Sequence, residues 1–357
     1  MREVFLQLVR IGIGTGIFPS SKFQVPGSID WTKLKAFADA QGLSAVVLDG
    51  LDKCNVEMLP LQLKLKWIGD VLQNYEHRYK SYENAISSLA GFYHQHEFKM
   101  MLLKGYACSL DWPKPEHRPC GDIDIWQFGE YQKADGLLRR EKGIVVDNSH
   151  QHHTVFYWNN FMVENHYDFI NVHHRKSGPK LEAIFKELGK DDSNCMELYG
   201  EKIYLPSVNL HALFLIYHTM LHFTSTEMSI RQILDWALFV KAHTNEIEWD
   251  WLLRIVDESH LRDFLNILNA ICVEDLGFDS NIFPYVQFDP ELKERVLNDI
   301  FAPEFTGREP SNLLRRIFFK YRRWKSHEWK HHLCFEETMW SIFRSEVWGH
   351  LLKPKSI

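Results

Sequence analysis

The chain has 357 residues, of which 45% are hydrophobic and 25% are charged, and its formal net charge is −6. These values are typical of a globular protein, and the length favours two or three packed units over a single core. The acidic balance argues against a general nucleic-acid binder, and the absence of any run of 18 apolar residues argues against a membrane span.

The cysteines and the N-terminus indicate a cellular compartment. No two of the six cysteines form a Cys-x-x-Cys pair, which favours free thiols in a reducing environment. The stretch from Met1 to Phe18 is broken by three glycines and lacks the pattern of a signal peptide. We therefore expect a cytoplasmic protein.

Residues 1–98 are predicted to be helical. Asp30 is a suitable N-cap for a helix from Trp31 to Gln41, which Gly42 ends. Apolar side chains then recur every three or four residues from Ile68 to Tyr93. This spacing predicts one long amphipathic helix.

Residues 99–205 mix short strands with helices. Asp122 to Trp126 alternates polar and apolar residues, as a strand with one polar face does. Asn159-Asn160 suits a tight hairpin turn. Further strands are expected at 99–103, 144–146, 154–158, 161–169 and in a hairpin at 196–204, with helices at 132–140 and 180–188.

The chain is expected to be helical again from residue 206 to its end. Helices are predicted at 207–223, 229–242, 249–258, 261–274, 290–300 and 312–325. The predicted fold is therefore α+β. A small mixed α/β core over 99–205 stands between an N-terminal helical region (1–98) and a C-terminal one (206–357).

The sharpest feature is the pair of carboxylates at Asp122 and Asp124. Residues i and i+2 of a strand point to the same face, close enough for both to hold one hard cation. A solvated strand face is the alternative, although aspartate is a poor strand former. Glu164 and His166 share a face of a later strand with Asp168, and Glu164 is our first choice for a third metal ligand, with Asp168 as the fallback.

Lys104-Gly105 ends a strand and opens a helix. Backbone N–H groups at a helix start bind phosphate, and Lys104 adds a positive charge. A lone Lys-Gly pair is a weak indication, and its value comes from its place just before the Asp-x-Asp strand.

Three segments together resemble the uncharacterised nucleotidyltransferases of the polymerase-β-like superfamily. These are Leu103-Lys-Gly105, Arg118-Pro-Cys-Gly-Asp-Ile-Asp124 and Val163-Glu-Asn-His166. The helical segment 210–242, with His218, His222, Arg231 and Asp235, is also similar to the C-terminal part of that family. The resemblance covers about residues 70–245.

The resemblance implies a sheet with helices packed on it and a site for Mg²⁺ or Mn²⁺. The metal ligands, which are also the catalytic residues, would be Asp122, Asp124 and Glu164. The site would transfer a nucleoside monophosphate from a triphosphate such as ATP to the hydroxyl of a small molecule, a protein or an RNA end. The residues expected to bind substrate are Lys104, Gly105, Arg118, His166 and Arg231.

One departure from the superfamily leaves two other functions open. Gly105-Tyr106 stands where the wider superfamily has Gly-Ser, so a serine hydroxyl is missing from the phosphate turn. The alternatives are a non-catalytic nucleotide-binding module of the same fold and a metal-dependent phosphohydrolase.

The histidines also allow more than one interpretation. A zinc cluster drawn from His152-His153, His166, His173-His174 and Cys120 has no recognised ligand spacing. His218 and His222 share a helical face and are expected to be buried, hydrogen-bonded residues at a domain contact.

Two basic features have a structural and a functional interpretation each. Arg231 either reaches phosphate or, more simply, forms a salt bridge with Asp235 one turn later. The basic and aromatic run 315–325 is expected to pack its aromatic side chains on the domain with its charges in water, with nucleic-acid or lipid binding as the alternative.

Overall fold

The computed structural model describes residues 1–16, 29–54, 59–172, 177–225, 228–284, 288–303, 310–338 and 340–341. Its centre is a six-stranded mixed sheet in the order β3-β4-β2-β1-β6-β5. The strands are β1 (Met101–Leu102), β2 (Ile123–Trp126), β3 (His153–Trp158), β4 (Phe161–His166), β5 (Cys195–Leu198) and β6 (Glu201–Tyr204). With helical regions on both sides in sequence, the fold is α+β, as predicted.

Two hairpins and two parallel pairings build the sheet. Asn159-Asn160, both with positive φ, turns β3 into the antiparallel β4, and Tyr199-Gly200 does the same between β5 and β6. The central β2 pairs in parallel with β4 and antiparallel with β1, and β1 pairs in parallel with β6. Strand β2, which carries the predicted acidic pair, is therefore an interior strand.

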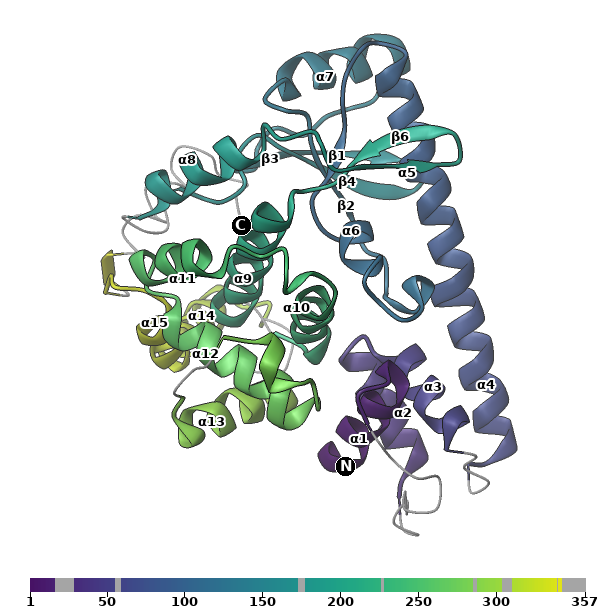
Figure 1. The fold of residues 1–357 in the computed structure, drawn as a ribbon, viewed down its shortest axis with the longest axis vertical. Helices are drawn as coiled ribbons and strands as arrows, with labels where there is room; N and C mark the ends of the chain where they lie inside the picture. Colours follow the sequence, from purple (N-terminus) through teal and green to yellow (C-terminus); the bar gives the residue numbers. More distant parts are fainter. Residues whose placement is uncertain are drawn as a thin grey trace.

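One long helix joins the N-terminal region to the sheet, as the apolar stripe predicts. It consists of α4 (Leu61–Val71), a π-helical segment (Leu72–His77) and α5 (Arg78–His94). In Figure 1 it runs from the N-terminal helices to the sheet. The wider π turn shifts the apolar stripe around the helix axis. Leu72, at the start of the π segment, is exposed, while Tyr82 and Leu89 in α5 are fully buried.

Short helices fill the rest of the N-terminal region and the core. The N-terminal region has α1 (Arg2–Ile13), α2 (Trp31–Ala40) and α3 (Ser44–Lys53). Asp30 caps α2 through Lys33 N, as expected. The core has α6 (Tyr106–Ser109), a 3₁₀ turn (Pro115–His117), α7 (Tyr131–Leu137) with a π segment (Leu138–Lys142), and α8 (Gly178–Leu188).

The C-terminal region is helical, as predicted. Its α-helices are α9 (Val208–Ser225), α10 (Ile230–His243), α11 (Trp249–Glu258), α12 (Arg262–Ala270), α13 (Pro290–Phe301), α14 (Leu313–Ser326) and α15 (Glu328–Cys334). A π segment (Ile271–Asp275) and a 3₁₀ turn (Ser280–Ile282) separate α12 from α13. A capping box of Ser229 and Gln232 starts α10.

The two faces of the sheet belong to two hydrophobic cores. Ile123 and Ile125 of β2 point into a core with α5 and α7, whereas Trp126 joins a larger core made by the N- and C-terminal helices. Figure 1 shows α7 on one side of the sheet and α9 and α10 on the other. Since side chains alternate along a strand, Asp124 points to the side of the C-terminal helices.

Two strand predictions need correction. Residues 144–146 are not a strand, because only Asp147 pairs with β3, exchanging two hydrogen bonds with Val155. Strand β4 ends at His166 rather than at Phe169. The reason is that the N–H groups of Tyr167 and Asp168 both donate to the carbonyl oxygen of His152, which turns the chain away from the sheet.

The expectation for the run 315–325 is also wrong in part. It forms α14, but Phe318 and Tyr321 are 61% and 53% exposed. Their spacing of three residues puts both on one helical face, and that face is open among the described residues.

All six cysteines are free thiols, as predicted. Across the described ranges, no helix combines the length and the hydropathy needed to cross a bilayer.

Candidate active site

Three acidic side chains from two neighbouring strands share one face of the sheet. In the parallel pairing of β2 with β4, Asp124 lies directly opposite Glu164. Asp122 precedes β2 by one residue and lies two positions from Asp124, so it belongs to the same face. The Asp124 side chain is only 1% exposed, whereas Glu164 is 16% exposed. Asp124 is therefore the buried member of the acidic group, and Glu164 is more accessible to solvent.

The carboxylates influence one another electrostatically. The negative charge of Asp124 and burial together raise the pKa of Asp122. Burial would also raise the pKa of Glu164, but a hydrogen bond with His166 and the charge of Lys104 outweigh it and lower that pKa. Close carboxylates of this kind need positive charge nearby.

Lys104 supplies part of that charge. Its Nζ lies 2.8 Å from Asp124 Oδ1, and its side chain is 16% exposed. Burial would lower the pKa of Lys104, but the charges of Asp124, Glu164 and Asp122 outweigh it and raise that pKa. Lys104 is thus an ammonium held inside the acidic group, a contact that the sequence analysis did not foresee.

His166 supplies the second positive group. Its Nε2 lies 3.1 Å from Asp124 Oδ1 and 3.7 Å from Glu164 Oε2. Burial opposes the charged imidazolium, but the hydrogen bonds with Asp124 and Glu164 prevail and raise its pKa to about 9. His153, the cross-strand partner of His166, behaves in the opposite way: burial and the nearby charges of His166 and His150 lower its pKa to about 3.

A tyrosine of α5 fixes the backbone at Asp122. The Tyr82 hydroxyl donates a hydrogen bond of 2.6 Å to the carbonyl oxygen of Asp122. A Cβ at Gly105 would come within 2.6 Å of that hydroxyl, and Gly105 has φ of +61°. Only glycine suits this position, so the Lys104-Gly105 turn brings the end of β1 against the start of β2.

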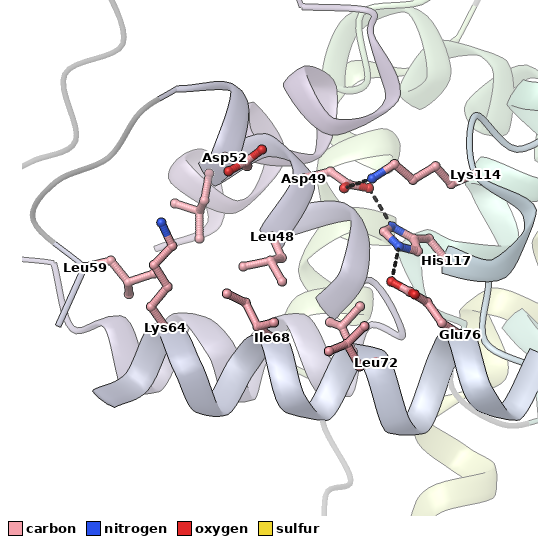
Figure 2. A pocket seen from close by; sticks show the side chains of 12 residues that line it. Leu48, Asp49, Asp52, Leu59, Lys64, Ile68, Leu72, Glu76, Lys114 and His117 are labelled. Atoms are coloured by element: carbon pink, nitrogen blue, oxygen red, sulfur yellow. Dashed lines mark hydrogen bonds and ion pairs between the residues drawn. The ribbon is translucent and has the colours of Figure 1, made fainter. Parts of the chain in front are cut away.

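The loop before β2 is anchored to the N-terminal helices. His117 Nδ1 and Lys114 Nζ each lie 2.6 Å from an oxygen of Asp49 in α3, and His117 Nε2 lies 3.5 Å from Glu76. Figure 2 shows this chain of contacts on the wall of a cavity of about 190 Å³. The contacts with His117 and Lys114 outweigh burial and lower the pKa of Asp49.

The same loop is anchored to α10 by Arg118. Its guanidinium forms two hydrogen bonds with the Asp235 carboxylate, of 2.8 and 2.9 Å, and Trp112 Nε1 donates a third at 2.9 Å. Both charged residues are buried. The expected salt bridge between Arg231 and Asp235 is wrong, because Arg118 occupies the carboxylate.

Arg231 remains half-buried beside this pair. Within the described ranges, no acidic side chain forms an ion pair with it. Burial and the like charge of Arg118 lower its pKa, while Asp235 and Asp122 act in the opposite direction. The Arg231 guanidinium therefore experiences the negative charges of Asp235 and Asp122 without forming an ion pair with either residue.

The histidines of α9 are hydrogen-bonded, as expected, but their partner is each other and both are half-buried rather than buried. His218 Nε2 and His222 Nε2 are 3.1 Å apart. Burial lowers the pKa of His222 to about 4, and the charges of Lys104, Arg231, Asp122 and Asp124 also act on it. The pair thus stands on the side of the acidic group that faces the C-terminal region.

Asp168, the fallback metal ligand, pairs with a lysine, whereas part of the zinc cluster considered from the sequence does come together. Asp168 forms an ion pair with Lys186 and lies beyond the end of β4. The ring nitrogens of His152, His153 and His166 do come together, but Cys120 is not among them. His173-His174 lie outside the described residues.

The donor set suits a divalent cation. Asp124, Glu164 and His166 each offer one ligand atom, and these atoms lie within 4.8 Å of one another. Carboxylate oxygens are the ligands that Mg²⁺ prefers. Tyr82 was not singled out from the sequence as a site residue, because a hydrogen bond between distant segments leaves no local pattern.

Comparison with known proteins agrees with this geometry. A family model described as uncharacterised nucleotidyltransferase matches residues 27–277, more than two thirds of the chain. No curated protein and no solved structure matches the chain. The match extends the resemblance of the sequence motifs on both sides, and it includes every residue of the acidic group. The chain belongs to the uncharacterised nucleotidyltransferase family.

Proposed function

We propose that the acidic group is the active site of a magnesium-dependent nucleotidyltransferase that moves a nucleoside monophosphate from a triphosphate to an acceptor hydroxyl. The observation that carries the proposal is the register of β2 and β4, which sets Glu164 opposite Asp124 and beside Asp122. Three carboxylates on one sheet face, in a nucleotidyltransferase family, are the residues that this chemistry needs.

Asp122, Asp124 and Glu164 would hold the cation, Mg²⁺ or Mn²⁺. When bound, it supplies positive charge to the triphosphate oxygens and favours the attacking oxygen in its deprotonated form. Asp122 and Glu164 are partly exposed and accessible to a ligand, whereas Asp124 is buried.

The basic residues around the group are assigned to the triphosphate. Lys104 presents its ammonium at Asp124, within the acidic group itself. Arg231 is a half-buried cation without an acidic partner in the described part of the chain, which suits a phosphate ligand. Arg118 and Gly105 act by positioning, because Asp235 engages the guanidinium of Arg118 and Gly105 leaves room for the Tyr82 hydroxyl.

The reaction makes one phosphorus–oxygen bond, breaks another and removes the proton of the acceptor hydroxyl. The acceptor oxygen attacks the α-phosphorus, the bond from that phosphorus to the bridging oxygen breaks, and pyrophosphate leaves. Glu164 lies on the more exposed side of the group and takes up the proton of the acceptor hydroxyl. Positioning of the two reactants contributes much of the acceleration.

Product analysis tests the proposal. The full-length protein is incubated with Mg²⁺ or Mn²⁺ and each of the four ribonucleoside triphosphates, together with pooled small molecules, RNA or protein as acceptors. Pyrophosphate and a nucleotide adduct, both lost in Asp122→Asn, are the expected products. Free monophosphate would indicate a phosphohydrolase, and bound but unconverted nucleotide would indicate a binding module.

A further inference from the structure

We infer that this chain holds a second metal site, built from the imidazoles of His152, His153 and His166, which takes a transition-metal ion of the zinc class. One ring nitrogen from each of these residues lies within 4.8 Å of the other two. The site shares His166 and Glu164 with the acidic group but takes no ligand from Asp122 or Asp124, and the inference does not rest on nucleotidyl transfer.

The backbone holds the three rings together. His153 and His166 are direct partners in the antiparallel pairing of β3 with β4. The carbonyl oxygen of His152 accepts hydrogen bonds from the N–H groups of Tyr167 and Asp168, which fixes it at the end of β4. The ring centroids of His152 and His153 are 4.4 Å apart, and each lies 5.4 to 5.6 Å from that of His166.

His166 and His153 each turn one ring nitrogen into the site, and His166 Nε2 would exchange its contact with Asp124 for the metal. His166 Nδ1 lies 3.3 Å from the carbonyl oxygen of Asp168, a contact that directs Nε2 into the site. Metal-binding histidines commonly donate their other ring N–H to a carbonyl or carboxylate in this way. His153 is only 8% exposed, and its Nδ1 has no hydrogen-bond partner among the residues that the structure describes.

A carboxylate completes the donor set. Glu164 Oε1 lies 3.7 Å from His153 Nε2, and Glu164 Oε2 lies 3.7 Å from His166 Nε2. Three imidazoles with one carboxylate in reach favour Zn²⁺, Co²⁺ or Mn²⁺ over Mg²⁺, which prefers oxygen ligands. His152 is half-buried, so the site opens to solvent on that side.

Cobalt titration tests the site. The full-length protein is freed of metal with a chelator and titrated with Co²⁺, and visible absorption is recorded before and after addition of Zn²⁺. Nitrogen-ligated Co²⁺ of low coordination number absorbs far more strongly than octahedral Co²⁺ bound by oxygens alone. We expect one such Co²⁺ per chain and loss of the band when Zn²⁺ displaces it.

Four variants locate the metal. His153→Gln and His152→Gln should weaken Zn²⁺ binding by more than about 100-fold, since loss of an outer partner alone costs about 10- to 100-fold. Asp122→Asn should keep the band, because Asp122 is not a ligand of this site. His150→Gln is the matched control: its ring stacks on His153 with centroids 4.8 Å apart but is outside the ligand group.

Two measurements distinguish loss of a metal ligand from loss of folding in these variants. Circular dichroism and melting of each metal-free variant show whether it folds, and His152→Gln answers the question if His153→Gln does not fold. A faint octahedral spectrum, a band that survives both histidine substitutions, or a band lost in Asp122→Asn would overturn the inference. Failure of nucleotide binding with an intact Co²⁺ band would count only against the proposed function.

Discussion

Asp124 and Glu164 lie directly opposite each other on the parallel strands β2 and β4. Their separation is therefore set by the hydrogen bonds of an interior sheet rather than by a loop. A site held by regular structure is pre-organised, because little movement is needed when charge arrives. The same register puts His166 opposite Trp126 and two residues beyond Glu164, on the same face of β4, and its ring contacts Asp124.

The two aspartates should respond differently to loss of charge. Asp122→Asn removes repulsion with Asp124, so the metal-free protein should be as stable as wild type or more so. Asp124→Asn should destabilise it by about 3 kcal/mol, because Lys104 and His166 lose a buried partner. Both variants should lose transfer. Chemical denaturation in chelator, together with product assays, checks this, and equal stability effects would contradict it.

The fold was predictable where local patterns decide structure. The stripe from Ile68 to Tyr93 predicted the long helix, and Asn159-Asn160 predicted the hairpin of β3 and β4. The ends of strands were less predictable. Strand β4 ends at His166 because the carbonyl oxygen of His152 takes the next two N–H groups, a contact that depends on the tertiary structure.

The candidate site shows the same division. Asp122, Asp124 and Glu164 could be proposed from the sequence because an i, i+2 spacing and a family motif are local features. The partners of the charged residues were not found. Arg118 and Asp235 are 117 residues apart in the sequence. Lys104 follows β1, whereas Asp124 lies in the neighbouring strand β2. No sequence spacing therefore indicates either pair.

Glu164→Gln should separate catalysis from nucleotide binding. The substitution keeps the shape of the side chain but removes the charge assigned to the acceptor hydroxyl. We expect kcat to fall by about 100-fold or more, within the usual range for general acid–base groups, with nucleotide affinity nearly unchanged. Titration calorimetry with a triphosphate and initial rates measure the two effects. Equal losses of nucleotide affinity and of kcat would indicate that Glu164 binds the triphosphate rather than the acceptor hydroxyl.

Lys104→Met should cost stability in the metal-free protein and recover it with metal. The variant leaves Asp124 with one positive partner, His166, instead of two, so a loss of about 2–3 kcal/mol is expected. Melting curves with and without Mg²⁺ test both points, with Lys133→Met, an exposed lysine paired with Glu130, as the control. A variant as stable as wild type in chelator would show that the ion pair contributes little.

The Arg118–Asp235 pair should behave as a structural clamp on the loop that leads to Asp122. A double-mutant cycle with Arg118→Met and Asp235→Asn should give a coupling energy of about 2–3 kcal/mol, since both side chains are buried and form two hydrogen bonds. Asparagine keeps an acceptor for Trp112. The Mg²⁺ concentration for half-maximal activity should rise in the single variants, which a purely stabilising pair would not cause. Additive stability effects would rule the clamp out.

The pKa of His166 makes the stability of the metal-free protein depend on pH in a defined window. The imidazole has an ordinary pKa of about 6.5 in the unfolded chain. In the folded protein, hydrogen bonds with Asp124 and Glu164 overcome burial and raise it to about 9. The stabilisation is therefore complete below about pH 6.5 and is lost as the pH rises towards 9, by roughly 3 kcal/mol in total.

His166→Gln isolates this contribution, because other titrating groups change both proteins alike. In chelator, the difference in unfolding free energy between wild type and variant should shrink from pH 6 to pH 10. A cation bound beside His166 favours the neutral ring, so Mg²⁺ affinity should rise over the same window and binding should release protons. A stability difference that stays constant with pH would mean that His166 is neutral in the folded protein.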